Sequence, residues 1–140
     1  MQVREDMAKP DFSGVWKFNR ARSSLQIPPP DSTTFVINHK EPRFHLERTH
    51  IFSGNSDFFT IDLLTDGNSV ELTHAGARIR ARLYWDDEAL VFYSELIRDD
   101  VRGTNVVWYR LTEEGQTFIA FERLSFEGHN HENNWVFDRQ

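Results

Sequence analysis

Short runs of β-branched and aromatic residues, cut by turn-forming pairs, constrain the fold of this chain more than any other feature. Pairs such as Ser53-Gly54, Asp66-Gly67 and Ala75-Gly76 stand between the runs, where the chain must reverse tightly. No stretch shows a sustained helical period, so no helix longer than a turn or two is expected. Together with the stretch Asp11–Asn19, the runs predict ten strands: Thr33–His39, Arg43–Phe52, Asp57–Leu64, Ser69–His74, Ala77–Trp85, Leu90–Arg98, Asn105–Thr112, Thr117–Phe126 and Asn134–Arg139.

Consecutive antiparallel strands joined by short links favour a closed sheet. An open sheet of this kind would leave two exposed edges, and closing it into a barrel removes both. The sequence therefore predicts an all-β fold, an up-and-down antiparallel barrel of about 8–10 strands. A sandwich with Greek-key crossovers is the alternative, although the short links favour the meander. A barrel of this size encloses more space than a few side chains fill, so a ligand cavity is expected.

Length and composition indicate one domain and exclude several partners. The 140 residues fit a single barrel domain over residues 11–140 behind an N-terminal extension over residues 1–10. Twelve Phe and four Trp supply a substantial core. A net charge of −6 argues against a nucleic-acid partner, which needs clustered Lys and Arg. The absence of Cys excludes disulfides and thiolate metal sites.

Two segments near the N-terminus are expected to lie outside the strands. Residues 1–10 are charged and lack an apolar run, so neither a signal peptide nor a membrane anchor is predicted there. No other run is long enough to span a membrane, and the expectation is a soluble, cytoplasmic protein. The segment Arg20–Ser32 contains Pro28-Pro29-Pro30, and because Pro lacks a backbone donor it predicts a loop with one short helical turn.

Alternation along the strands indicates which side chains face the barrel interior. The clearest strand turns Ala77, Ile79, Ala81, Leu83 and Trp85 inward, and its outward row of Arg78, Arg80 and Arg82 is interpreted as a solvated face rather than an anion-binding patch. The same reasoning turns Phe44, Leu46, Arg48, His50 and Phe52 inward on another strand. The predicted ligand-binding residues are Arg48, His50, Leu83, Phe92, Ser94, Tyr109 and Glu122. Two alternatives stay open: a strand phase shifted by one residue, or a purely structural pairing of Arg48 with Glu122.

The histidines offer weak support for a metal or haem. His129 and His131 are placed in a turn region, Gly128–Asn134, without a third ligand in register, so no metal site is predicted. A haem-binding barrel would need one axial ligand, for which His50 or His74 would serve, but no cofactor is predicted.

The acidic pairs Asp86-Asp87, Asp99-Asp100 and Glu113-Glu114 are expected at hairpin tips, where exposed carboxylates make poor acid–base catalysts. The chain also lacks a nucleophile elbow and a phosphate-binding loop. If the chain is an enzyme, the expected chemistry is proton transfer or cyclisation inside the barrel. The base would be Glu122 or His50, and Tyr109 or Arg48 would polarise an oxygen.

Both ends of the chain resemble a known superfamily. Phe12–Phe18, which contains Gly14-x-Trp16, resembles the first strand of the calycins, the superfamily of lipocalins and fatty-acid-binding proteins. Asn133–Gln140 resembles the closing strand of bacterial lipocalin-like proteins, in which a step such as Arg22-Ser23 precedes a Pro-rich loop. The resemblance implies that Trp16 closes one end of the barrel beneath a stacked Arg139, so that the site lies away from it. Unlike fatty-acid-binding proteins, the chain shows no helix-turn-helix lid after its first strand.

These observations favour a binding module over an enzyme. The expected ligand is a small apolar or amphipathic molecule whose carboxylate or carbonyl meets Arg48. The alternatives are an isomerase- or cyclase-type enzyme that uses the same cavity, a haem-binding barrel, and a protein-interaction barrel with a collapsed core.

Overall fold

Ten strands and one short turn of 3-10 helix make up the computed structural model, which describes residues 9–140. Most of the predicted N-terminal extension therefore lies outside the described residues. The helical turn η2 covers Arg20–Arg22, within the segment for which one short turn is expected. No helix in residues 9–140 is long and apolar enough to cross a membrane. The strands are β1 (Gly14–Phe18), β2 (Ser32–Lys40), β3 (Arg43–Phe52), β4 (Asn55–Leu64), β5 (Val70–His74), β6 (Ala77–Asp86), β7 (Ala89–Arg98), β8 (Val101–Thr112), β9 (Thr117–Phe126) and β10 (His129–Arg139).

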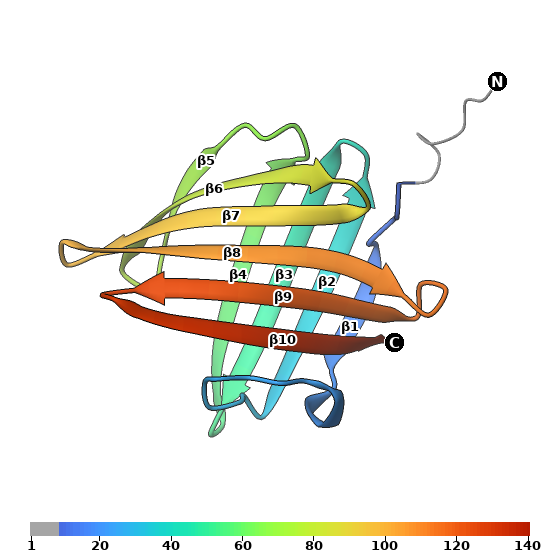
Figure 1. Cartoon of the computed structure of the whole chain (residues 1–140), viewed down its shortest axis with the longest axis horizontal. Helices are drawn as coiled ribbons and strands as arrows, with labels where there is room; N and C mark the ends of the chain where they lie inside the picture. The colour runs from blue at the N-terminus through green and yellow to red at the C-terminus, as the bar shows by residue number, and fades with distance from the viewer. Residues whose placement is uncertain (1–8) are drawn as a thin grey trace.

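The strands form one antiparallel meander that curls almost into a closed barrel. The hydrogen-bonded order is β4-β3-β2-β1-β10-β9-β8-β7-β6-β5, so β1 pairs with both β2 and the last strand, β10. Figure 1 shows two layers, with β1–β4 behind and β6–β10 in front, whose strands cross at a steep angle. The backbone pairing stops between β4 and β5, the two ends of this order. The prediction of an all-β up-and-down barrel is confirmed.

Two strands start several residues earlier than predicted. β8 begins at Val101 rather than Asn105, and β10 begins at His129 rather than Asn134. The reason is the tightness of the hairpins: Asp99 and Asp100 both have positive φ, at 51° and 66°, and the backbone pairing of β7 with β8 continues up to them. The placement of His129 and His131 in a turn is therefore wrong, because both lie in β10, which pairs with β9 from its first residue.

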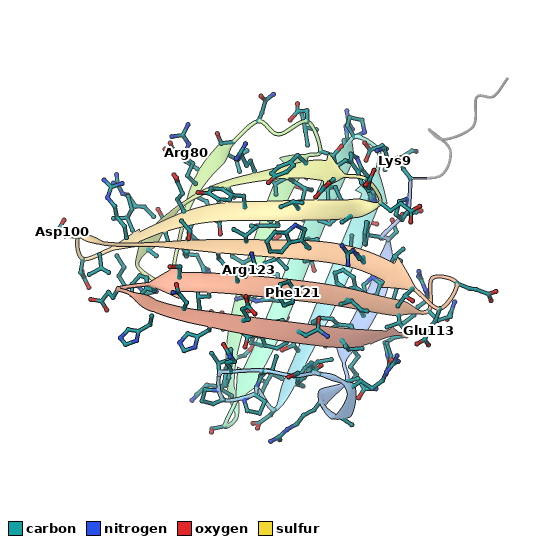
Figure 2. All side chains as sticks on the ribbon, viewed as in Figure 1. Lys9, Arg80, Asp100, Glu113, Phe121 and Arg123 are labelled. Atoms are coloured by element: carbon teal, nitrogen blue, oxygen red, sulfur yellow. The ribbon has the colours of Figure 1, made fainter. Side chains whose placement is uncertain are left out.

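Strand phase follows the predicted alternation over most of the chain. In β6, Ala77, Ile79, Ala81 and Leu83 are buried, whereas Arg78, Arg80 and Arg82 are exposed. Phe52 differs from the expectation, because 41% of its surface is exposed. It is the last residue of β3. The outer face also carries aromatic residues. The guanidinium carbon of Arg123 lies 5.6 Å from the ring centroid of Trp108 and 5.8 Å from that of Phe121. Figure 2 labels Arg123 and Phe121.

Trp16 fills one end of the barrel. Its side chain is fully buried, its indole Nε1 donates to the carbonyl oxygen of Phe12 at 3.0 Å, and its ring lies 5.4 Å from that of Phe118. The Arg139 guanidinium stacks over the indole, 4.3 Å from the ring centroid, which is the contact that the calycin resemblance implies. A side chain on Gly14 would lie 2.7 Å from Arg139 Nη1, so glycine permits this stacking. This end of the barrel is closed.

The segment between β1 and β2 covers the opposite end. Leu25 and Ile27 pack against the hydrophobic core, and the backbone of Ser24 pairs with that of Asn134 in β10. Gln26 is also tied to β10, because its side-chain oxygen accepts from the backbone N–H of Glu132 at 2.7 Å. The Pro-rich loop is therefore anchored onto the barrel.

The closed end should dominate the stability of the barrel. We expect Trp16→Ala to lower the free energy of unfolding by about 3–5 kcal/mol, because it removes a fully buried ring and leaves a cavity. Trp108→Ala is the matched control, since Trp108 is only half-buried on the outer face and should cost clearly less. Urea denaturation followed by circular dichroism measures both values. Equal losses for the two variants would contradict this role of Trp16.

Candidate ligand-binding site

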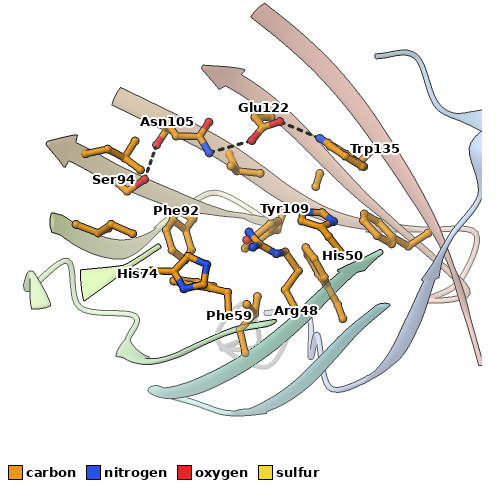
Figure 3. Close-up of a pocket in the computed structure, with 17 residues that line it drawn as sticks. Arg48, His50, Phe59, His74, Phe92, Ser94, Asn105, Tyr109, Glu122 and Trp135 are labelled. Carbon is orange, nitrogen blue, oxygen red and sulfur yellow. Dashed lines mark hydrogen bonds between the residues drawn. The ribbon is translucent and has the colours of Figure 1, made fainter. Parts of the chain in front are cut away.

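A cavity of about 190 Å³ lies between the two layers of the barrel, on the side away from Trp16 (Figure 3). Its wall is largely apolar, and Phe35, Leu46, Phe59, Phe92, Val107 and Phe137 all contribute to it. Its polar side chains come from both layers: Arg48, His50, His74, Ser94, Asn105, Tyr109 and Glu122. A mostly apolar wall with a few converging polar groups is typical of small-molecule sites.

Most of the predicted ligand-binding residues meet in this cavity. Those that line it are Arg48, His50, Phe92, Ser94, Tyr109 and Glu122. Leu83 also points inward and is fully buried, but it belongs to the packed core and does not line the cavity. The inward phase of Leu83 is thus correct, whereas its predicted place in the site differs from the structure.

Glu122 of β9 is held by three neutral donors. Its Oε1 accepts from the indole Nε1 of Trp135 at 2.9 Å and from Nδ2 of Asn133 at 3.0 Å. Its Oε2 accepts from Nδ2 of Asn105 at 2.9 Å. Figure 3 shows Glu122 between Asn105 and Trp135. Within residues 9–140, no Lys, Arg or His nitrogen lies at ion-pair distance from this carboxylate.

Arg48 of β3 has a different partner, Asp57 of β4. Arg48 Nη2 donates to Asp57 Oδ2 at 2.6 Å, and the guanidinium lies 5.2 Å from the ring centroid of Phe59. Burial lowers the pKa of Arg48 from its usual value, and the neighbouring Asp57 charge opposes that shift. Asp57 Oδ1 is also 3.1 Å from Nε2 of His74 in β5. The alternative pairing of Arg48 with Glu122 is not formed.

His50 and Tyr109 are uncharged at neutral pH. Burial, and then the Arg48 charge, lower the pKa of His50 to about 4, and its Nδ1 is 2.6 Å from Thr33 Oγ1. Burial also raises the pKa of Tyr109 well above its usual value. These two residues can therefore form neutral hydrogen bonds with a ligand but do not supply charge.

Two buried polar atoms of the site lack a hydrogen-bond partner within the described residues: Arg48 Nε, a donor, and Asn105 Oδ1, an acceptor. Leaving such an atom unsatisfied costs about 1–3 kcal/mol. Both side chains line the cavity, Arg48 from the rear layer and Asn105 from the front layer. Unsatisfied polar groups at a cavity commonly find partners in a ligand.

Sequence reasoning missed three residues of this network, Asp57, Asn105 and Asn133, and named His74 only as a possible axial ligand of haem. Asn105 and Asn133 share the phase of the inward positions Val107 and Trp135. Asn105 begins the predicted strand Asn105–Thr112, whereas alternation reaches Asn133 only when the last strand is extended. Asp57 and His74 meet across the unpaired β4–β5 seam, and no local pattern predicts that contact.

The geometry disfavours haem and offers no metal site in the described residues. His50 and His74 both line the cavity, but 190 Å³ is below the roughly 300–1,000 Å³ of drug-sized pockets and does not admit a porphyrin. No group of three or more His, Asp or Glu side chains in residues 9–140 is arranged to hold a metal ion.

No protein-family model matches the chain, and no curated protein matches it in sequence. Solved structures do match. Secretory abundant heat soluble protein 4 from Ramazzottius varieornatus superposes with a TM-score of 0.61 at 15% identity, over 93% of this chain and 95% of that one. Human cRBP IV gives a TM-score of 0.60 at 14% identity, over 94% and 99%. Zebrafish ileal bile acid-binding protein, complexed with cholic acid, gives 0.60 at 12% identity, over 92% and 98%.

The chain has a calycin-like barrel fold. At these identities the similarity shows the fold alone. The neighbours support the calycin resemblance without singling out the bacterial lipocalin-like proteins.

The pKa of His50 predicts a stability effect between about pH 4 and 6.5. Above pH 6.5 neither the folded nor the unfolded state protonates this ring, so it has no effect there. As the pH falls toward 4, the unfolded state takes up a proton that the calycin-like barrel resists, so stability should decrease and then level off. NMR titration should place the His50 midpoint near pH 4.

His45 is the matched control for this titration. Hydrogen bonds to Glu47 and Asp62 raise the pKa of His45 above the usual histidine value of 6.5, so its ring should titrate above that pH. A His50 midpoint at or above that of His45 would show that His50 is not desolvated as described.

Proposed function

We propose that this calycin-like barrel is a binding module for a compact amphipathic molecule, held in the cavity between the two layers. The observation that carries the proposal is the apolar cavity with two buried polar atoms at its wall, Arg48 Nε and Asn105 Oδ1, that have no hydrogen-bond partner within residues 9–140. A ligand that fills the apolar space and also hydrogen-bonds to these two atoms would gain binding free energy from both contacts.

The size of the cavity supports a small ligand. At about 190 Å³ it lies below the range of roughly 300–1,000 Å³ for drug-sized ligands, so one or two fused rings suit it better than a long acyl chain. The anchored loop over residues 20–31 limits the space further, because Leu25 and Ile27 already pack against the core. The zebrafish neighbour complexed with cholic acid supports ligand binding by analogy of fold.

A more specific proposal concerns the family of the protein and its location. Phe12–Phe18 and Asn133–Gln140 are the stretches on which a bacterial lipocalin-like protein is proposed. A cytoplasmic location is proposed on a different ground, the lack of a long apolar run in the sequence. Trp16 closes its end of the barrel, so we assign ligand entry to the loop-covered end or to the β4–β5 seam.

Filling the cavity should weaken binding strongly. We expect wild-type protein to bind 1-naphthylmethanol saturably in isothermal titration calorimetry, and Ser94→Phe to weaken binding at least about tenfold because the new ring occupies the site. Ala120→Leu, at another cavity-lining position, is a milder variant with the same expected direction.

The control for this experiment is Glu95→Phe. It places the same ring on the next residue of β7, on the exposed outer face, and should leave binding unchanged. Binding that survives both cavity-filling variants would place the probe elsewhere on the protein. The proposed function would be contradicted if neither 1-naphthylmethanol nor its amine and carboxylate analogues bound saturably to the wild-type protein.

A further inference from the structure

We infer that the ligand of this cavity carries an amine, protonated at neutral pH, that contacts Glu122 and Asn105, and that it is not a carboxylic acid. This inference rests on the proposed function, since it names the chemical class of the molecule that the cavity binds. It departs from the expectation of a ligand carboxylate at Arg48.

The first observation is the charge balance of the cavity wall. The positive charge of Arg48 is matched by Asp57, at 2.6 Å, and His50 and Tyr109 are neutral at neutral pH. Glu122 contacts only amide and indole N–H groups, which satisfy its hydrogen bonds but bring no charge. The wall therefore presents one carboxylate with no direct ion-pair partner in the described residues, although the Arg48 charge acts on it at longer range. A cationic ligand would supply a direct partner.

The second observation is the hydrogen-bonding capacity that remains. A carboxylate has about four acceptor positions. Oε1 of Glu122 uses two of them, and Oε2 uses one, on Asn105. The Oδ1 of Asn105, on the side chain that donates to Oε2, is also an acceptor that has no partner in the described part of the chain. An ammonium group is a pure donor and suits these two adjacent acceptors.

The third observation is the partner of Arg48. A ligand carboxylate at Arg48 would have to share the guanidinium with Asp57 and would add a second uncompensated negative charge to a cavity that already holds Glu122. Like charges in a partly buried site are mutually destabilising.

Three probes of similar shape test this inference: 1-naphthylmethylamine, 1-naphthylmethanol and 1-naphthoate. Isothermal titration calorimetry at pH 7 gives the dissociation constant of each. We expect the amine to bind wild-type protein at least about tenfold more tightly than the acid. Glu122→Gln keeps the shape of the side chain and removes its charge. In this variant the dissociation constants of the amine and the acid should differ by no more than about threefold.

The matched control is Glu132→Gln. Glu132 is an exposed acid on β10 that pairs with Arg123 on the outer face, so the ratio should stay as in wild type. If Glu122→Gln fails to fold, the ranking of the three probes on wild-type protein decides alone.

The outcomes separate the inference from the proposed function. An acid that binds as tightly as the amine, or an amine-to-acid ratio that Glu122→Gln leaves unchanged, would overturn the amine assignment while the binding function stands. Failure of all three probes to bind would overturn the proposed function, and the amine assignment with it.

Discussion

Closure of the meander through β1 is the constraint on which the rest of the structure depends. This strand has only five residues, yet it pairs with β2 on one side and with β10 on the other. It therefore joins the two layers that Figure 1 shows crossing each other. Trp16, at the centre of β1, fixes that junction by packing inward beneath Arg139. Because the layers are joined in this way, side chains from β3 and β9 face one cavity.

The layers do not meet by backbone pairing on the other side, and side chains replace the missing ladder there. The contact of Asp57 in β4 with His74 in β5 bridges the unpaired seam. The same carboxylate pairs with Arg48, the guanidinium that lines the cavity. Closure of the barrel and the charge of the site are thus linked, because the acid that bridges the seam also pairs with Arg48, and Glu122 is left without a direct ion-pair partner among residues 9–140.

How far sequence reasoning predicts the site depends on where a residue lies in its strand. Arg48, Ser94 and Glu122 lie well inside their strands, and a period of two turns them inward once the phase of each strand is set. Asn133 lies in a polar stretch that is typical of a turn, although β10 already pairs there. The partner of Arg48 depends on how β4 and β5 approach each other, which no hairpin pattern specifies. Leu83 shows the remaining limit, because facing inward does not decide which part of the barrel stays empty.

Asn133 connects the covering loop to the charged group of the site. It is fully buried; its Oδ1 accepts from the backbone N–H of Gln26 at 2.7 Å, and its Nδ2 donates to Glu122 Oε1. One amide therefore fixes both the position of the loop and the orientation of the carboxylate. The free acceptor position lies on the other oxygen, Oε2, beside Asn105. A donor can bind there without displacing Asn133, so the loop can stay anchored while the cavity is occupied.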